Sequence, residues 1–63
     1  MGTLLTVEDI CTRYRVSKAT VYRWTSEDLI PHARIGGKLF FRIKDLEPWE
    51  EKFFHLATEV SLL

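Results

Sequence analysis

The sequence predicts a single domain that is mainly helical and carries one small β-hairpin. Apolar residues recur at spacings of three and four in three separate segments, which is typical of helices that bury one face. Two β-prone runs flank Gly36-Gly37, and a glycine pair between such runs favours a tight hairpin turn. With 63 residues the chain lies near the lower limit for a domain that folds alone, so we expect one compact core.

The first helix is expected to follow Thr6. Thr6 can cap the helix N-terminus, and Asp9 three residues later completes a weak form of the capping box. The apolar stripe of this helix would consist of Val7, Ile10, Cys11 and Tyr14. The surrounding sequence offers no base to activate a thiol, so we interpret Cys11 as a buried structural residue and not as a nucleophile. Residues 1–5 are interpreted as a short lead-in.

The second helix is expected to begin after Ser17, whose hydroxyl can accept a hydrogen bond from the first turn. Val21 and Trp24 fall on one apolar face. The opposite face and the positions beside it hold Ala19, Tyr22, Arg23 and Ser26. A basic, hydroxyl-rich outer face suits a helix that enters the DNA major groove, although an ordinary amphipathic helix with a solvated face would show the same pattern.

The connection between these two helices, residues 13–16, is so short that the helices must turn sharply against each other. Such a pair is a helix-turn-helix arrangement, in which the first helix crosses the phosphate backbone of DNA. We therefore expect Arg13 and Arg15 to lie near phosphates, where they contribute affinity without reading the sequence.

The hairpin is expected after Pro31, which cannot continue a helix. Its strands would be the runs 33–35 and 39–42. Phe40 and Phe41 interrupt the alternation of the second strand, so one of them should sit at the edge of the core. The hairpin would form a basic wing, because its tip and arms carry Arg34, Lys38 and Arg42.

The third helix is expected to begin at Asp45 as its N-cap, which places Pro48 in the first turn, where a missing N–H costs little. If the helix began earlier, Pro48 would lie one residue too late and would distort it locally. Apolar residues then follow at heptad spacing: Leu46, Trp49, Phe53, Leu56, Val60 and Leu63. We therefore predict a DNA-binding domain over residues 1–50 and a helical extension over residues 51–63. This extension would either fold back onto the domain or pair with another chain.

The net charge of zero conceals a division along the chain. Residues 1–44 hold eight Lys and Arg against four acids, whereas residues 45–63 hold one against five. Between Thr12 and Ser26 there are four cations and no acid. This division is typical of a protein with an anion-binding face and an acidic back, although charges scattered over a solvated surface would give the same totals.

Several classes of function are disfavoured. The sequence contains no paired-carboxylate, catalytic-triad or phosphate-loop pattern, and so short a chain leaves little room for a substrate pocket, so we expect no enzyme. One cysteine and two distant histidines argue against a metal site. We find no signal peptide and no apolar run long enough to span a membrane, so we expect no membrane partner and a cytoplasmic location.

Taken together, five segments resemble the excisionase-type members of the MerR-like winged helix-turn-helix group. The segments are 5–9, 16–24, 29–31, 34–38 and 41–49, and they span nearly three quarters of the chain. The resemblance implies a small, non-enzymatic DNA-binding protein without a cofactor, from a phage or mobile element. It also implies DNA contacts from Ser17, Lys18, Thr20, Tyr22, Arg23, Gly37, Lys38 and Arg42. The sequence departs from the family at Arg15, where a glycine is common, and at Pro48.

Many members of this family are recombination directionality factors, which bend attachment-site DNA and help an integrase excise. We accordingly expect a protein of a bacterial cell or a phage-infected host that binds double-stranded DNA and acts with a tyrosine or serine integrase. It would self-associate on DNA or through its C-terminal helix. Arg23 is our candidate for reading a guanine edge. Two alternatives stay open: a regulator of prophage transcription, and an adaptor that binds protein with the same fold.

Overall fold

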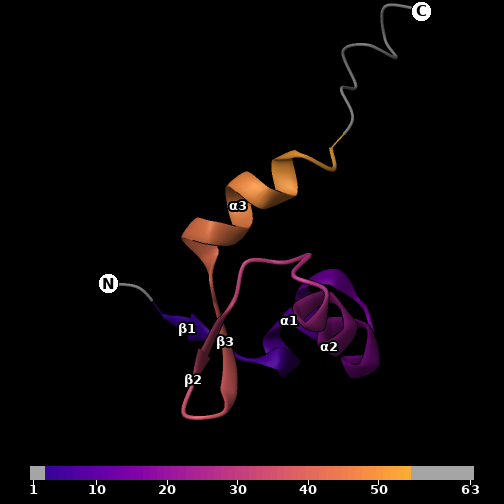
Figure 1. The fold of residues 1–63 in the computed structure, drawn as a ribbon. Helices are drawn as coiled ribbons and strands as arrows, with labels where there is room; N and C mark the ends of the chain where they lie inside the picture. The colour runs from indigo at the N-terminus through magenta and orange to yellow at the C-terminus, as the bar shows by residue number, and fades with distance from the viewer. Residues whose placement is uncertain (1–2, 55–63) are drawn as a thin grey trace, which may run out of the picture.

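The computed structural model describes residues 3–54 and contains three helices and one antiparallel sheet (Figure 1). α1 and α2 pack against each other beside the sheet, and α3 leaves the end of the central strand (Figure 1). This is the predicted winged helix-turn-helix architecture. The elements in chain order are β1 (Leu4–Leu5), α1 (Val7–Tyr14), α2 (Lys18–Ser26), β2 (Ala33–Ile35), β3 (Lys38–Arg42) and α3 (Ile43–Glu51).

β3 is the central strand, with β1 on one side and β2 on the other. β2 pairs with β3 with Arg34 opposite Leu39, which confirms the predicted hairpin. β1 pairs with the other edge of β3, with Leu5 opposite Phe41. β1 is missing from the sequence prediction, so the sheet has three strands instead of two. A two-residue strand shows no alternation, and its partner lies far along the chain.

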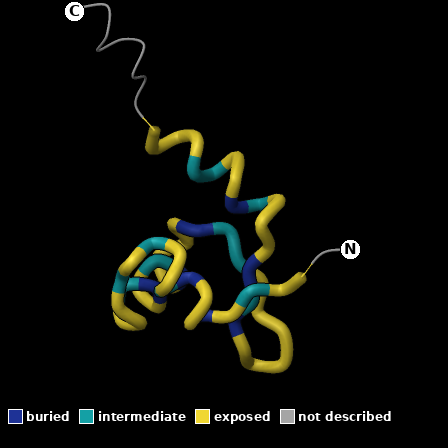
Figure 2. Tube along the Cα trace, turned by 180° about the vertical axis from the view of Figure 1, so that it is seen from behind, coloured by how far each residue is buried: buried dark blue, intermediate teal, exposed yellow. Residues whose placement is uncertain are grey.

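The hydrophobic core lies where α1 and α3 pack against β3 and α2 packs against α1 (Figure 2). Phe41 is 1% exposed and Phe40 is half-buried, so Phe40 is the phenylalanine at the core edge. Cys11 is half-buried and packs against the core, as expected of a structural thiol. The buried apolar residues are Val7, Ile10, Val21, Ile30, Leu39, Phe41 and Leu46.

The predicted starts of α1 and α2 are confirmed. At α1 the Thr6 hydroxyl accepts a hydrogen bond from the Asp9 N–H at 3.3 Å, and the Asp9 carboxylate accepts one from the Thr6 N–H at 2.8 Å. At α2 the Ser17 hydroxyl accepts a hydrogen bond from the Thr20 N–H at 3.3 Å. Each cap satisfies N–H groups that the first helical turn leaves without a partner.

The turn between α1 and α2 is built on a left-handed residue. Arg15 has φ 57° and ψ 50°, and the Val16 N–H donates to the Cys11 carbonyl at 3.1 Å. This geometry is the Schellman motif, whose left-handed position usually holds glycine. α2 ends in the same way, with Asp28 at φ 56° and a hydrogen bond from the Leu29 N–H to the Trp24 carbonyl at 2.7 Å.

The predicted start of α3 was wrong. The helix begins at Ile43, and its N-cap residue, Arg42, makes no capping side-chain bond. Asp45 accepts a hydrogen bond from Arg42 Nε at 2.7 Å instead of capping the helix. Because β3 runs directly into α3, the sheet and not a polar cap sets the start of the helix. Pro48 therefore lies inside α3, where it cannot donate to the carbonyl of Lys44.

The end of α3 also differs from the prediction. The helix ends at Glu51, and the N–H groups of Phe53 and Phe54 donate to carbonyls three residues earlier, at 2.9 and 3.3 Å. The predicted heptad helix is therefore interrupted at this point. The remaining positions of the predicted seam, Leu56, Val60 and Leu63, lie outside the described residues.

We predict that Arg15→Gly stabilises the domain. A left-handed backbone costs a side-chain-bearing residue about 1 kcal/mol, and glycine avoids this cost. The substitution should raise the free energy of unfolding by about 1 kcal/mol and the melting temperature by about 4–8 °C. Thermal denaturation followed by circular dichroism tests this prediction. Arg15→Ala is the matched control, because it removes the charge and keeps the strain; an equal gain in both variants would contradict the backbone explanation.

Candidate nucleic-acid interface

The outer face of α2 is exposed, as the sequence predicts. Tyr22 is 51% exposed, and Arg23 and Ser26 are also exposed. On the other side of the helix Val21 and Thr25 are buried, and the Thr25 hydroxyl donates to the Tyr22 carbonyl at 2.9 Å. α2 is therefore anchored through one face and presents an aromatic, basic and hydroxyl-bearing surface on the other.

The wing is the β2–β3 hairpin. Its turn consists of Gly36 at φ 59° and Gly37 at φ 81°, a pair of left-handed residues that suits a two-residue hairpin. A Cβ atom at Gly37 would meet nothing within 4 Å, so the turn requires this glycine for its backbone conformation and not for space. Lys38 follows the turn as the first residue of β3, opposite Ile35.

A groove of about 650 Å³ lies between α2 and the wing, and we call it the wing groove. Tyr22 and Ser26 of α2 line it on one side, and Arg34, Gly37 and Lys38 of the hairpin line it on the other. The helix face and the wing are therefore brought together around one concave surface. Its two cations and its hydroxyl groups are the groups that bind phosphate oxygens in DNA complexes.

The start of α1 also lines the wing groove, through Thr6 and Glu8. Glu8 Oε2 lies 3.1 Å from Lys18 Nζ, and both side chains are largely exposed. Hydrogen bonding to its own backbone N–H and then to Lys18 lowers the pKa of Glu8, and the bond to Glu8 raises the pKa of Lys18. Both groups are charged at neutral pH, so Glu8 offsets part of the positive charge around the groove.

Ser17 and Thr20 lie at the N-terminal end of α2, beside Lys18. Their hydroxyl oxygens are 3.2 Å apart, and Thr20 is half-buried. Arg15 is exposed in the turn before them. Four of the eleven predicted contacts line the wing groove: Tyr22, Arg34, Gly37 and Lys38. Five more lie on α2 or in the turn before it, outside that lining: Arg15, Ser17, Lys18, Thr20 and Arg23.

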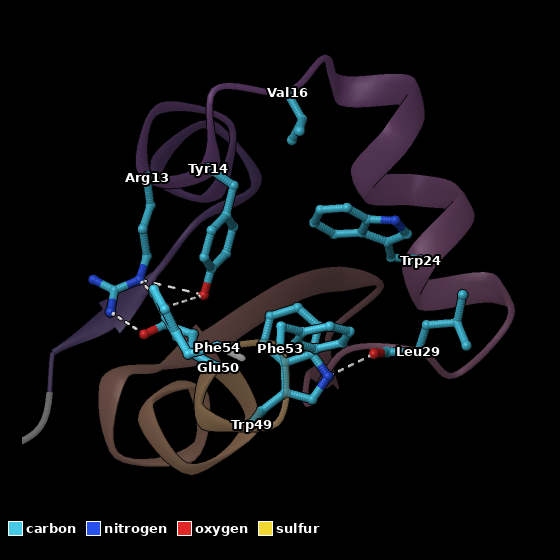
Figure 3. Close-up of a pocket in the computed structure, with 9 residues that line it drawn as sticks. All are labelled: Arg13, Tyr14, Val16, Trp24, Leu29, Trp49, Glu50, Phe53 and Phe54. Atoms are coloured by element: carbon cyan, nitrogen blue, oxygen red, sulfur yellow. Dashed lines mark hydrogen bonds and ion pairs between the residues drawn. The ribbon is translucent and has the colours of Figure 1, made fainter. Parts of the chain in front are cut away.

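The two remaining predicted contacts, Arg13 and Arg42, make ion pairs within the fold. Arg13 forms a two-pronged pair with Glu50 of α3, with Nε–Oε2 and Nη2–Oε1 distances of 2.6 and 3.1 Å (Figure 3). The Tyr14 hydroxyl donates to the same carboxylate. Arg42 Nε lies 2.7 Å from Asp45 Oδ2. Arg13 therefore links α1 to α3 and does not line the wing groove.

Sequence reasoning missed three exposed polar residues of the wing groove: Thr6, Glu8 and Ser26. Thr6 and Glu8 have local roles at the start of α1, and those roles explain their residue types without reference to a site. Ser26 was placed on the outer face of α2, but no sequence pattern connects that face to the wing. The two charge signals in the sequence, the acid-free basic stretch around α2 and the cations of the hairpin, do not point to the start of α1.

A family model described as a helix-turn-helix domain matches residues 4–53. The chain belongs to this helix-turn-helix family. The match covers every helix and strand described above, the wing included. Membership of this helix-turn-helix family indicates sequence-specific DNA binding, and the family is typically non-enzymatic. No curated protein and no solved structure matches the chain.

Two further observations apply to residues 3–54 of this helix-turn-helix protein. Over that range no group of three His, Cys, Asp or Glu side chains comes together in a way that could hold a metal ion. No helix within the same range is long and apolar enough to cross a membrane.

We predict that the Arg13–Tyr14–Glu50 network limits stability at both ends of the pH scale. The Arg13 hydrogen bond lowers the pKa of Glu50. The ionised Glu50 carboxylate therefore adds to the free energy of unfolding above pH 4.5, and this stabilisation is lost as the pH falls below that value. Burial raises the pKa of Tyr14 from 10.0 to about 12. The stabilisation from the neutral Tyr14 hydroxyl is therefore complete below pH 10 and is lost between pH 10 and 12.

Urea unfolding measured across this pH range tests the network. Glu50→Gln should cost about 1 kcal/mol at neutral pH and should weaken the acid-side loss of stability. Tyr14→Phe should weaken the alkaline-side loss. Glu47→Gln, an exposed residue of the same helix, is the matched control and should leave the profile unchanged. Identical acid-side profiles for Glu50→Gln and the unsubstituted protein would exclude the network as the cause.

Proposed function

We propose that this protein is an excisionase-type recombination directionality factor, which binds attachment-site DNA and directs a tyrosine or serine integrase toward excision. The observation that supports DNA binding is the wing groove, where the exposed face of α2 and the basic wing border one concave surface. The proposed role as an excisionase rests on the order and spacing of the five sequence segments that resemble excisionases.

In the proposed complex α2 lies in the major groove with Arg23 against base edges. A guanidinium can bind guanine through two parallel hydrogen bonds, a contact worth about 1–3 kcal/mol of discrimination. One DNA strand would pass through the wing groove, with its phosphates between α2 and the wing. Lys38 and Arg34 would neutralise these phosphates, and Lys38 would lie at the adjacent minor groove or its backbone.

The α2–wing surface of one domain covers only a short stretch of DNA. Single modules bury about 600–1,000 Å² of protein surface on DNA, so useful affinity requires additional contacts. In the proposed function several copies bind side by side or contact the integrase, and linked binding events raise the overall affinity. Small deformations added by successive copies would bend the attachment site.

We predict that Arg23→Ala weakens specific binding more than non-specific binding. The loss on the cognate site should be about 1–3 kcal/mol, because a base contact is removed along with a charge. Fluorescence anisotropy with cognate and scrambled duplexes at one salt concentration measures both losses. Arg23→Lys is the matched control, since it keeps the charge and loses the paired hydrogen bonds. Equal losses on the two duplexes would contradict a role in base reading.

We predict that Lys38→Ala lowers affinity equally for all sequences. It should reduce the slope of log affinity against log salt by about one unit, because one fewer counterion is released. Lys44→Ala makes the same change of net charge on α3, outside the wing groove, and should leave the slope unchanged. An unchanged slope in Lys38→Ala would rule out a phosphate contact at the wing.

The experiment that tests the proposed function begins with a random-sequence duplex titrated at several salt concentrations. Salt-dependent binding is expected, and its absence at low salt would overturn DNA binding and favour the protein-binding adaptor. Selection from a random duplex library then identifies the preferred site. Repeated adjacent copies of that site, together with stimulated excision when an integrase acts at the same DNA, would support the excisionase role. A single site that only represses a promoter would favour the transcriptional regulator.

A further inference from the structure

A second groove, of about 760 Å³, lies on the side of α2 away from the wing, and we call it the aromatic groove (Figure 3). Its aromatic walls are Tyr14, Trp24, Trp49, Phe53 and Phe54. Val16 and Leu29 add aliphatic surface, and the paired Arg13 and Glu50 lie at one border. The aromatic groove and the wing groove share no lining residue.

The inner part of the aromatic groove is held in place by ring packing. Tyr14, Trp24 and Trp49 contact one another edge to face, with ring centroids 5.8–6.2 Å apart. Trp49 Nε1 also donates to the Leu29 carbonyl at 2.8 Å, which ties α3 to the segment after α2 (Figure 3). These contacts arise from three helices, so the groove is a preformed feature of the folded domain.

The outer part of the aromatic groove is exposed to solvent. Phe53 and Phe54 are 61% and 70% exposed, and Leu29 is 51% exposed. Phe53 stacks edge to face on Trp49 at 4.9 Å, which leaves its outer side uncovered. A contiguous exposed apolar surface on a small protein usually marks a site where another segment or another molecule packs.

The chain continues from the rim of the aromatic groove. The described residues end at Phe54, which itself lines the groove, and nine further residues follow. Leu56, Val60 and Leu63 occur in that stretch at spacings of four and three, which is the pattern of a helix that anchors in an apolar groove. A helix rises about 1.5 Å per residue, so a helix of nine residues spans about 13 Å, enough to lie across a groove of this volume.

We propose that residues 55–63 of the same chain cover the aromatic groove, with Leu56, Val60 and Leu63 against the tryptophans. A tethered segment acts at an effective concentration near millimolar, whereas a second copy must bind at the free protein concentration. Packing of the segment onto its own domain is therefore favoured over packing of the same segment from a second copy that makes equivalent contacts. The proposal does not depend on DNA binding, because the segment would cover the side of α2 opposite the wing groove.

Tryptophan fluorescence of the full chain tests this proposal. The sequence has only two tryptophans, Trp24 and Trp49, and both line the groove, so the emission reports on its coverage alone. The double substitution Leu56→Ser with Leu63→Ser should shift the emission to longer wavelength and increase quenching by acrylamide. It should also raise the unfolding equilibrium constant by roughly tenfold or more, because two leucine side chains lose their burial.

Leu62→Ser is the matched control, because it removes a leucine from the same segment outside the 56–60–63 pattern. It should leave the emission, the quenching and the unfolding constant unchanged. Salt-dependent binding of a random duplex should be retained in both variants. The expected emission of the unsubstituted protein is independent of its concentration, and sedimentation should give a monomer.

Two outcomes overturn the proposal. Unchanged emission and quenching in the Leu56→Ser, Leu63→Ser variant would mean that the segment does not cover the aromatic groove. A dimer in sedimentation, with emission that moves to longer wavelength on dilution, would mean that a second copy covers it instead. Neither outcome bears on the proposed DNA-binding function, which the duplex titration tests separately.

Discussion

The burial of β3 is the constraint on which the rest of the fold depends. β3 pairs with strands on both edges, packs against α1 and α3, and runs into α3 without a loop. Phe41 in this strand is 1% exposed, and fully burying such a side chain contributes about 1.5–3 kcal/mol. Because β3 is also one of the two strands of the wing, the position of Lys38 relative to α2 is set by how β3 packs on the helices.

The nine residues of α2 place side chains in three different environments. Val21 and Thr25 are buried in the core, Tyr22 and Ser26 line the wing groove, and Trp24 lines the aromatic groove. These sets follow from the helical repeat of 3.6 residues, which distributes successive side chains around the axis. The exposed outer surface of α2 is thus supported by packed residues on the opposite face, and a site held by a packed helix is more precisely placed than one on a loop.

The cations of the domain divide into two groups with different physical tasks. Arg13 is half of a two-pronged pair with Glu50 that joins α1 to α3, so its charge is used within the fold. Arg34 and Lys38 border the wing groove, where their charges are available to an anion. Lys18 belongs to neither group, because its pair with Glu8 is exposed and contributes little stability.

The sequence by itself determined the features that arise from neighbours along the chain. The caps at Thr6 and Ser17, the apolar stripes of α1 and α2, and the Gly36-Gly37 turn depend on residues within one helical turn or one hairpin, so local spacing reveals them. Only the tertiary structure decided the pairing of β1, the inclusion of Pro48 within α3, the partner of Arg13 and the joining of α2 to the wing around one groove. Each of these depends on groups far apart in sequence, whose approach is fixed by the burial of the common core.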